Sequence, residues 1–166
     1  LIDQEVQART VAVDGPYLRL PGHSLKLGAR DEALWKRISA ELVRDRFKPP
    51  RVRDFASAYS VPEADMRRLL QRLAKVGRVV EVAPDQYFLR PVVAEMIGVA
   101  RELGPDFSAA QFRDKLDNGR KVAILILEFF DRHGITIRRG DVRRTVPQKL
   151  EQFGPMPAKE VAEANG

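Results

Sequence analysis

The segment 107–134 constrains the fold of this chain most, because it carries two helix signals separated by a turn. Ser108 is a good helix N-cap, and apolar residues spaced four apart follow it. Asp117-Asn118-Gly119 forms a turn signal, and a second, longer apolar segment runs from there to His133-Gly134. This pattern predicts two helices joined by a tight turn.

The apolar segment Val122–Leu127 has two interpretations when taken alone. Every position in it is apolar, which fits either a buried strand or a buried helix. Glu128, Asp131 and Arg132 extend the segment beyond strand length, and Gly134 is typical of a helix end. We therefore predict a helix here.

Two β-prone runs follow the second helix, at residues 135–139 and 142–145. They are joined by Gly140-Asp141, and Gly-Asp between such runs is a hairpin signal. Helix, turn, helix and hairpin in this order are typical of a winged helix. The second helix is then the recognition helix, and the hairpin is the wing.

The same order of elements occurs once upstream. Three predicted helices and a hairpin span residues 31–46, 51–59, 62–75 and 78–90. Lys48-Pro49-Pro50 ends the first helix, since proline removes a backbone donor and restricts the residue before it. Pro91 opens a further helix directly after the hairpin, so we expect almost no linker between the two modules.

The predicted fold class is mainly α with small β-hairpins, an α+β arrangement of tandem winged-helix domains. The predicted parts are residues 1–24 as the closing wing of a preceding winged-helix domain, 25–90 as one winged-helix domain, 91–146 as a winged-helix domain that binds nucleic acid and 147–166 as a disordered tail. The start lacks Met and opens in mid-pattern, which indicates a fragment of a longer protein.

The composition favours some classes of function and excludes others. The chain carries 29 Lys and Arg against 23 Asp and Glu, a net charge of +6, which favours a polyanionic partner without choosing among RNA, DNA and a membrane surface. The absence of cysteine excludes disulfides, thiolate metal sites and cysteine catalysis. No phosphate-loop or dinucleotide motif is present, and the two histidines lack ligand spacing. We expect no enzymatic activity, no cofactor and no metal site.

Basic residues cluster where a winged helix meets nucleic acid. One cluster lies at the start of the recognition helix, where free N–H groups favour phosphate, and the other lies on the wing. In the upstream module, Glu63 and Asp65 occupy the corresponding helix start and repel phosphate. The predicted nucleic-acid-binding residues are therefore Asn118, Gly119, Arg120, Lys121, Arg138, Arg139, Gly140 and Arg143.

On two motifs the chain resembles the C-terminal region of the bacterial selenocysteine-specific translation elongation factors, the SelB family. The motifs are FRDKLDNGRKVAILILEFFDRHGITIRRGDVR and GPYLRLPGHSLKL, the latter followed by the module 31–90. The resemblance covers about residues 1–145. It implies that the last domain anchors the selenocysteine insertion (SECIS) hairpin of the messenger RNA during selenocysteine incorporation.

The resemblance also carries residue roles and partners. It assigns Arg120 and Lys121 to the basic pair of the recognition helix, and Arg138, Arg139 and Gly140 to the wing. Family members often have an aromatic residue where this chain has valine after the basic pair. The resemblance implies that the full-length protein binds GTP, selenocysteinyl-tRNA and the ribosome in the cytoplasm. We expect a monomer with no membrane contact.

Two other functions fit a pair of winged helices. One is a DNA-binding transcriptional regulator, and the other is a protein-interaction scaffold without nucleic acid. Regulators usually dimerise on two half-sites, whereas this sequence shows unlike tandem modules and no evident dimerisation helix. The RNA-hairpin anchor is therefore the preferred hypothesis.

Overall fold

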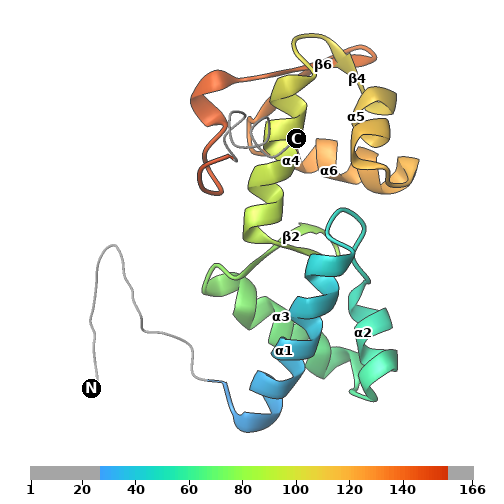
Figure 1. Cartoon of the computed structure of the whole chain (residues 1–166), viewed down its shortest axis with the longest axis vertical. Coiled ribbons are helices and arrows are strands. Elements are labelled where there is room, and N and C mark those ends of the chain that lie inside the picture. Colours follow the sequence, from blue (N-terminus) through green and yellow to red (C-terminus); the bar gives the residue numbers. More distant parts are fainter. Residues whose placement is uncertain (1–26, 157–166) are drawn as a thin grey trace, which may run out of the picture. The chain divides into compact units, whose positions relative to one another are not determined.

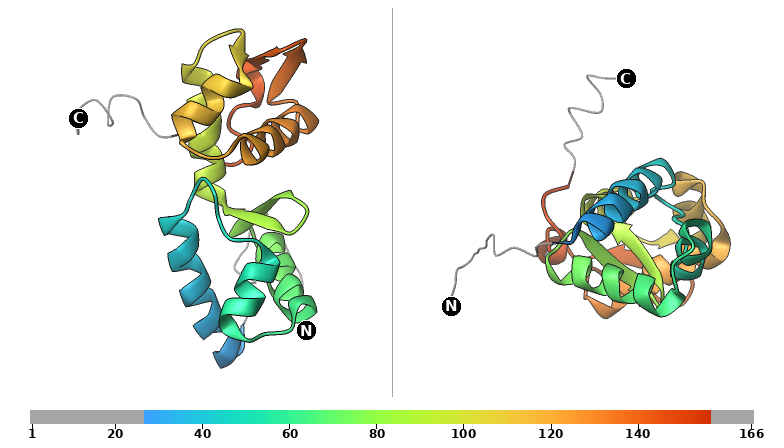
Figure 2. Two further views of the ribbon diagram at one scale, coloured as in Figure 1. Left: turned by 90° about the vertical axis from the view of Figure 1, so that its right-hand side faces the viewer. Right: turned by 90° about the horizontal axis from the view of Figure 1, so that it is seen from below.

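The structure is a computed structural model that describes residues 27–156 (Figures 1 and 2). It divides into a unit Leu1–Ala33, described from residue 27, and a unit Leu34–Gly166, described to residue 156. The predicted closing wing in residues 1–24 lies outside the described residues. Both predicted winged-helix modules, from Leu34 onward, lie within the second unit.

Three helices and a hairpin form the first module, as predicted. They are α1 (Ala29–Arg44), which begins in the first unit, α2 (Val52–Tyr59), α3 (Glu63–Lys75), β2 (Val79–Ala83) and β3 (Gln86–Leu89). Leu34, Ile38 and Leu42 recur every four residues on α1, and all three are buried. Helix α1 ends before the prolines at 49–50, because proline cannot continue a helix.

The first hairpin leads directly into the last module. Strands β2 and β3 pair antiparallel with Val80 opposite Phe88, and Asp85 in the turn adopts a positive φ of 62°. Strand β3 ends at Leu89, and α4 (Arg90–Glu102) starts at the next residue (Figure 1). The expected absence of a linker is confirmed.

The last module completes the predicted helix, turn, helix and hairpin. Its elements are α4, β4 (Phe107–Ser108), α5 (Ala109–Leu116), α6 (Arg120–Arg132), β5 (Thr136–Arg139), β6 (Val142–Thr145) and the 3-10 helix η1 (Pro147–Lys149). The Gln111 backbone N–H donates to Ser108 Oγ at 3.1 Å, which confirms Ser108 as a helix cap. The ambiguous apolar segment lies in α6, so the prediction of a helix is confirmed.

The short strand β4 was not predicted. It pairs with β6, and the three-stranded sheet has the order β4-β6-β5. A strand of two residues has no periodicity, so its sequence carries no strand signal. Its pairing adds support to the inner strand of the wing.

The two modules share a hydrophobic core within the second unit. Val82 and Phe88 of the first hairpin belong to the same buried cluster as Phe112, Ile126 and Phe130 of the last module. Polar contacts also cross the junction: Arg132 Nη2 donates to the Val82 carbonyl at 3.3 Å. The first wing therefore packs directly against the last module.

The prediction of a disordered tail from residue 147 is wrong for residues 147–156. Leu150 is buried in the core of the last module, and the Phe153 ring lies 5.6 Å from that of Phe129. Arg90 Nη2 donates to the Gln152 carbonyl at 3.2 Å. Isolated apolar residues between prolines gave no periodic signal, yet they pack on the core. Residues 157–166 lie outside the described part.

Candidate nucleic-acid interface

The N-terminus of α6 is open to solvent. Gly119 is the N-cap residue and has no side chain, and no cap hydrogen bond from a side chain occurs there in the described structure. The first bond of the helix joins Ala123 N–H to the Gly119 carbonyl at 3.0 Å, so the N–H groups of residues 120–122 lack helical acceptors. Arg120 and Lys121 beside them are exposed. Such a helix end favours an anion.

A groove adjoins this helix end. It has a volume of about 570 Å³ and is lined by residues of both modules: Lys48, Pro49, Pro50, Arg51, Arg53, Asp54, Gln86, Gly119, Lys121 and Val122. A Cβ placed on Gly119 would lie 3.7 Å from Lys48 Nζ. The Lys48 ammonium therefore stands close to the positive end of the α6 dipole.

Two side-chain amides hold the loop that carries Lys48. Gln86, buried in the first hairpin, donates from Nε2 to the Pro49 carbonyl at 3.3 Å. Asn118 donates from Nδ2 to the Phe47 carbonyl at 2.9 Å. The loop between α1 and α2 is thus fixed against the start of α6.

The role predicted for Asn118 needs correction. Its Nδ2 is bonded to the Phe47 carbonyl, and its Oδ1 is shielded from solvent. The side chain joins the two modules and is not presented to a ligand. Its neighbour Asp117, in the left-handed conformation with φ 53°, ends α5 and turns the chain toward α6.

Positive charge is in excess at the groove, where Lys48, Arg51, Arg53 and Lys121 line it beside the carboxylate of Asp54. Within residues 27–156, no carboxylate forms an ion pair with Lys48, Arg53, Arg120 or Lys121. A lysine beside the positive end of a helix is electrostatically unfavourable unless an anion lies between them. The arrangement suits a polyanion backbone that contacts both modules.

The wing presents cations on both of its faces. Arg138 and Arg139 are adjacent on β5, so their side chains point to opposite faces, and both are exposed. Arg138 Nε donates to the Gly140 carbonyl at 2.9 Å across the turn. Gly140 has a φ of 61°, a conformation that favours glycine at the tip of a hairpin. The predicted wing residues Arg138, Arg139 and Gly140 therefore lie together at an exposed tip.

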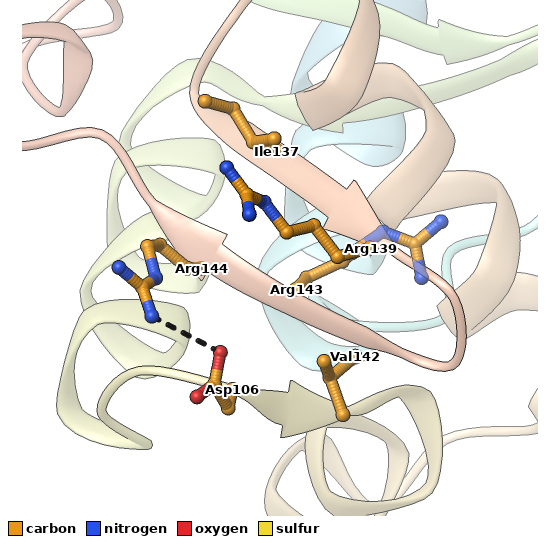
Figure 3. Close-up of a pocket in the computed structure, with 6 residues that line it drawn as sticks. All are labelled: Asp106, Ile137, Arg139, Val142, Arg143 and Arg144. Carbon is orange, nitrogen blue, oxygen red and sulfur yellow. Dashed lines mark hydrogen bonds and ion pairs between the residues drawn. The ribbon is translucent and has the colours of Figure 1, made fainter.

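One face of the wing combines cations with an exposed apolar side chain (Figure 3). Its residues surround a hollow of about 30 Å³: Asp106, Ile137, Arg139, Val142, Arg143 and Arg144. The hollow has room for about one water molecule, so it is no ligand cavity. Arg144 Nη2 lies 3.3 Å from Asp106 Oδ1, and the Ile137 side chain remains half exposed. This face is therefore shallow and open to solvent, with cations around an exposed apolar side chain.

The structure contradicts the predicted RNA contact of Arg143. The Arg143 side chain is only 6% exposed, and its Nη2 lies 2.9 Å from Asp131 Oδ2 on α6. Side chains alternate along β6, so the Arg143 side chain turns toward Asp131 on α6, while those of Val142 and Arg144 lie on the opposite face of the strand. Arg143 is a structural ion-pair residue.

The recognition helix of the first module, α3, is occupied by its own ion pairs. Arg67 donates from Nε to Asp85 Oδ1 at 2.7 Å and from Nη2 to Glu63 Oε2 at 2.6 Å. The hydrogen bond from Arg67 lowers the pKa of Asp85 below its usual value. Arg68 pairs with Asp65 one turn along α3. These two arginines are engaged within the module.

The loop between α1 and α2 also contributes to the groove, which its sequence alone did not predict. Lys48, Arg51 and Arg53 line the groove beside α6, although they lie about 70 residues earlier in the chain. In the sequence, Lys48-Pro49-Pro50 predicts only the end of a helix. A basic residue before two prolines in a fixed loop was the available signal.

The described residues offer little that fits other chemistry. Across residues 27–156, no group of three or more His, Asp or Glu side chains is placed to hold a metal ion. In the same part of the chain, no helix is both long and apolar enough to cross a membrane.

Fold and site together define a tandem winged-helix protein with a basic face across both modules. Two family models match it: "Selenocysteine-specific elongation factor, winged helix domain" over residues 28–88, and "Elongation factor SelB, winged helix" over residues 99–145. A solved structure, the mRNA-binding domain of elongation factor SelB from Escherichia coli in complex with SECIS RNA, is 33% identical with a TM-score of 0.63. The match covers 72% of this chain and 98% of that one. The chain therefore belongs to the SelB family of selenocysteine-specific elongation factors.

Curated relatives agree with this assignment. The selenocysteine-specific elongation factor of Escherichia coli strain K12 is 36% identical over 75% of this chain, and that of Desulfomicrobium baculatum is 28% identical over 87%. The matches span 20% and 23% of those proteins, so the chain corresponds to about a fifth of their length. These comparisons do not favour a DNA-binding transcriptional regulator.

Proposed function

We propose that this chain is the part of a selenocysteine-specific elongation factor that binds a SECIS RNA hairpin of a messenger RNA. The observation that carries the proposal is the open start of α6, where unpaired cations of both modules converge in the described structure. A related domain of known structure was solved with SECIS RNA, which supports the same ligand class.

In the proposed mechanism, the start of α6 is an anchor that binds the RNA backbone, and the wing recognises the shape or the loop of the hairpin. The free N–H groups at the start of α6 bind a phosphate, and Arg120 and Lys121 neutralise neighbouring phosphates. RNA helices hide their base edges in a narrow groove, so proteins read loops, bulges and backbone shape. Arg138 and Arg139 on the wing then contact a second backbone segment or an extruded base.

The groove extends the anchor onto the first module. Lys48 and Arg53 continue the line of cations from Lys121 across the junction. A stem held at the start of α6 would place consecutive phosphates along this groove. The first module is thus proposed to contribute affinity through its loop, while α3 remains outside the interface.

Several properties of the whole protein follow as proposals from the family. The full-length factor would bind GTP, selenocysteinyl-tRNA and the ribosome through other regions and act in the cytoplasm. The fragment itself is proposed to act as a monomer, without enzymatic activity, cofactor or membrane contact.

Titration with three nucleic acids tests the proposal. The chain is titrated with a bulged RNA hairpin, with the same RNA closed into a regular duplex, and with a DNA duplex of equal length, all at one salt concentration. We expect the tightest binding to the bulged hairpin. Equal or tighter binding to the DNA duplex would support a DNA-binding protein, and no binding to any of the three would support a protein-interaction scaffold.

A further inference from the structure

Asp131, in the last turn of α6, contacts both strands of the wing. Its Oδ1 accepts a hydrogen bond from Thr136 Oγ1 on β5 at 2.6 Å. Its two carboxylate oxygens also bind Arg143 on β6, at 3.1 and 3.2 Å from Nε and 2.9 Å from Nη2. One carboxylate therefore ties the recognition helix to β5 and β6 together.

This network is largely withdrawn from solvent. Thr136 is 2% exposed, and the Arg143 and Asp131 side chains are 6% and 26% exposed. A buried ion pair adds little net stability compared with apolar packing, but a displaced strand would leave its charges buried and unpaired. The network therefore fixes the register of the wing against α6 more than it strengthens the fold.

Apart from this network, β4 pairs with β6 opposite Arg143 and Val142 and supports the inner strand of the wing, whereas β5 is the edge strand. Ile135 is fully buried at the base of β5, whereas residues 137–141 are all exposed. The cations of the tip, Arg138 and Arg139, lie in this exposed part. Their strand, β5, is the edge strand of the sheet, so its position depends on the pairing with β6 and on the contact of Asp131 with Thr136 and Arg143.

We propose that Asp131 and Arg143 are positioning residues for RNA recognition, acting through the wing arginines that they hold in place. The inference rests on the proposed function, because it requires the wing to contact RNA. Preorganised cations lose less conformational entropy when they bind. Breaking the contact between Asp131 and Arg143 should therefore make the wing more mobile and weaken RNA binding, although no side chain that contacts RNA is removed.

The substitution Asp131→Asn separates positioning from simple electrostatics. It removes a negative charge beside a basic surface, so electrostatics alone predicts tighter RNA binding. Positioning predicts the opposite: about tenfold weaker binding, equivalent to one charge-assisted hydrogen bond, and a flatter salt dependence. Asp141→Asn makes the same charge change at the exposed wing tip and is the matched control. It should bind RNA as tightly as the wild type or more tightly.

A double-mutant cycle with Arg139→Ala shows whether the effect passes through the wing. In the wild-type background Arg139→Ala should weaken binding about tenfold. In the Asp131→Asn background it should add less than about twofold, whereas Arg120→Ala should keep its full effect. Circular dichroism and faster amide exchange confined to residues 136–145 would show that the module stays folded.

Other results would overturn the inference. If Asp131→Asn binds RNA as tightly as Asp141→Asn, or if Arg139→Ala has the same effect in both backgrounds, the network has no positioning role. If Asp131→Asn fails to fold, Arg143→Lys and Thr136→Val each remove part of the network, and wild-type affinity in both would also overturn it. Failure of the wild-type chain to bind any RNA hairpin would instead overturn the proposed function.

Discussion

Replacing Arg120 and Lys121 together with alanine should remove the phosphate anchor while leaving the fold intact. Both side chains are exposed at the start of α6, and neither forms an ion pair within the described residues. Alanine has the highest helix propensity, so the helix itself should not be weakened. The buried residues of α6 beside them, Val122 and Ala123, are untouched.

The expected weakening follows from counterion release. Each neutralised phosphate contributes about 0.7–0.9 to the slope of log affinity against log salt concentration, so removing both cations flattens the slope by about 1.4–1.8 units. At about 0.15 M salt the same release corresponds to about 15- to 30-fold weaker binding. If Arg120 also binds a base, the weakening should exceed this figure.

Fluorescence anisotropy with a labelled bulged hairpin, repeated at several salt concentrations, measures both quantities. Arg67→Ala combined with Arg68→Ala makes the same change in net charge, but its arginines are paired with carboxylates of the first module. This control should keep the wild-type slope. An unchanged slope in the Arg120 and Lys121 variant, with an intact circular dichroism spectrum, would show that the start of α6 is not the phosphate-binding anchor. The anchor would then have to lie on the wing.

Three further predictions concern the first module and the C-terminal segment. Lys48→Ala combined with Arg53→Ala should weaken hairpin binding about tenfold or more in the same titration. An unchanged affinity would show that the groove is not part of the RNA-binding surface. Arg67→Ala should lower the melting temperature at neutral pH. Arg67 lowers the pKa of Asp85 in the folded protein, so the pair stabilises the fold fully at pH values above 3.8, the usual pKa of the carboxyl. This stabilisation is lost as the pH falls through the lower pKa of the folded state. The melting temperatures of the wild type and the Arg67→Ala variant should therefore converge in acid. Leu150→Ala should reduce the free energy of unfolding in urea by about 2–3 kcal/mol, and no reduction would mean that the segment does not pack on the core.

The sequence predicted the helices and hairpins well because their signals are local. Ser108 with its capping box, the four-residue spacing on α1 and Gly140 at the wing tip each act within a few residues of the chain. The two-residue strand β4 and the packing of Leu150 depend on partners far along the chain. Local patterns cannot predict such long-range packing.

The candidate site was predicted in part for the same reason. The basic start of α6 and the tip of the wing are local features, and the structure exposes Arg120, Lys121, Arg138 and Arg139. The burial of Arg143 follows from strand alternation toward Asp131 on another element. The contribution of Lys48 depends on how the two modules pack, which no local pattern records.

Hydrogen–deuterium exchange of the chain, with and without the bulged hairpin, tests the central claim most directly. The amides at the start of α6 have no helical acceptor, so they should exchange fast in the free protein. With RNA bound, we predict slower exchange at residues 119–122, in the loop 47–53 and along the wing, and no change at the start of α3. Protection centred on residues 62–68 and 84–86, with none at 119–122, would contradict the account.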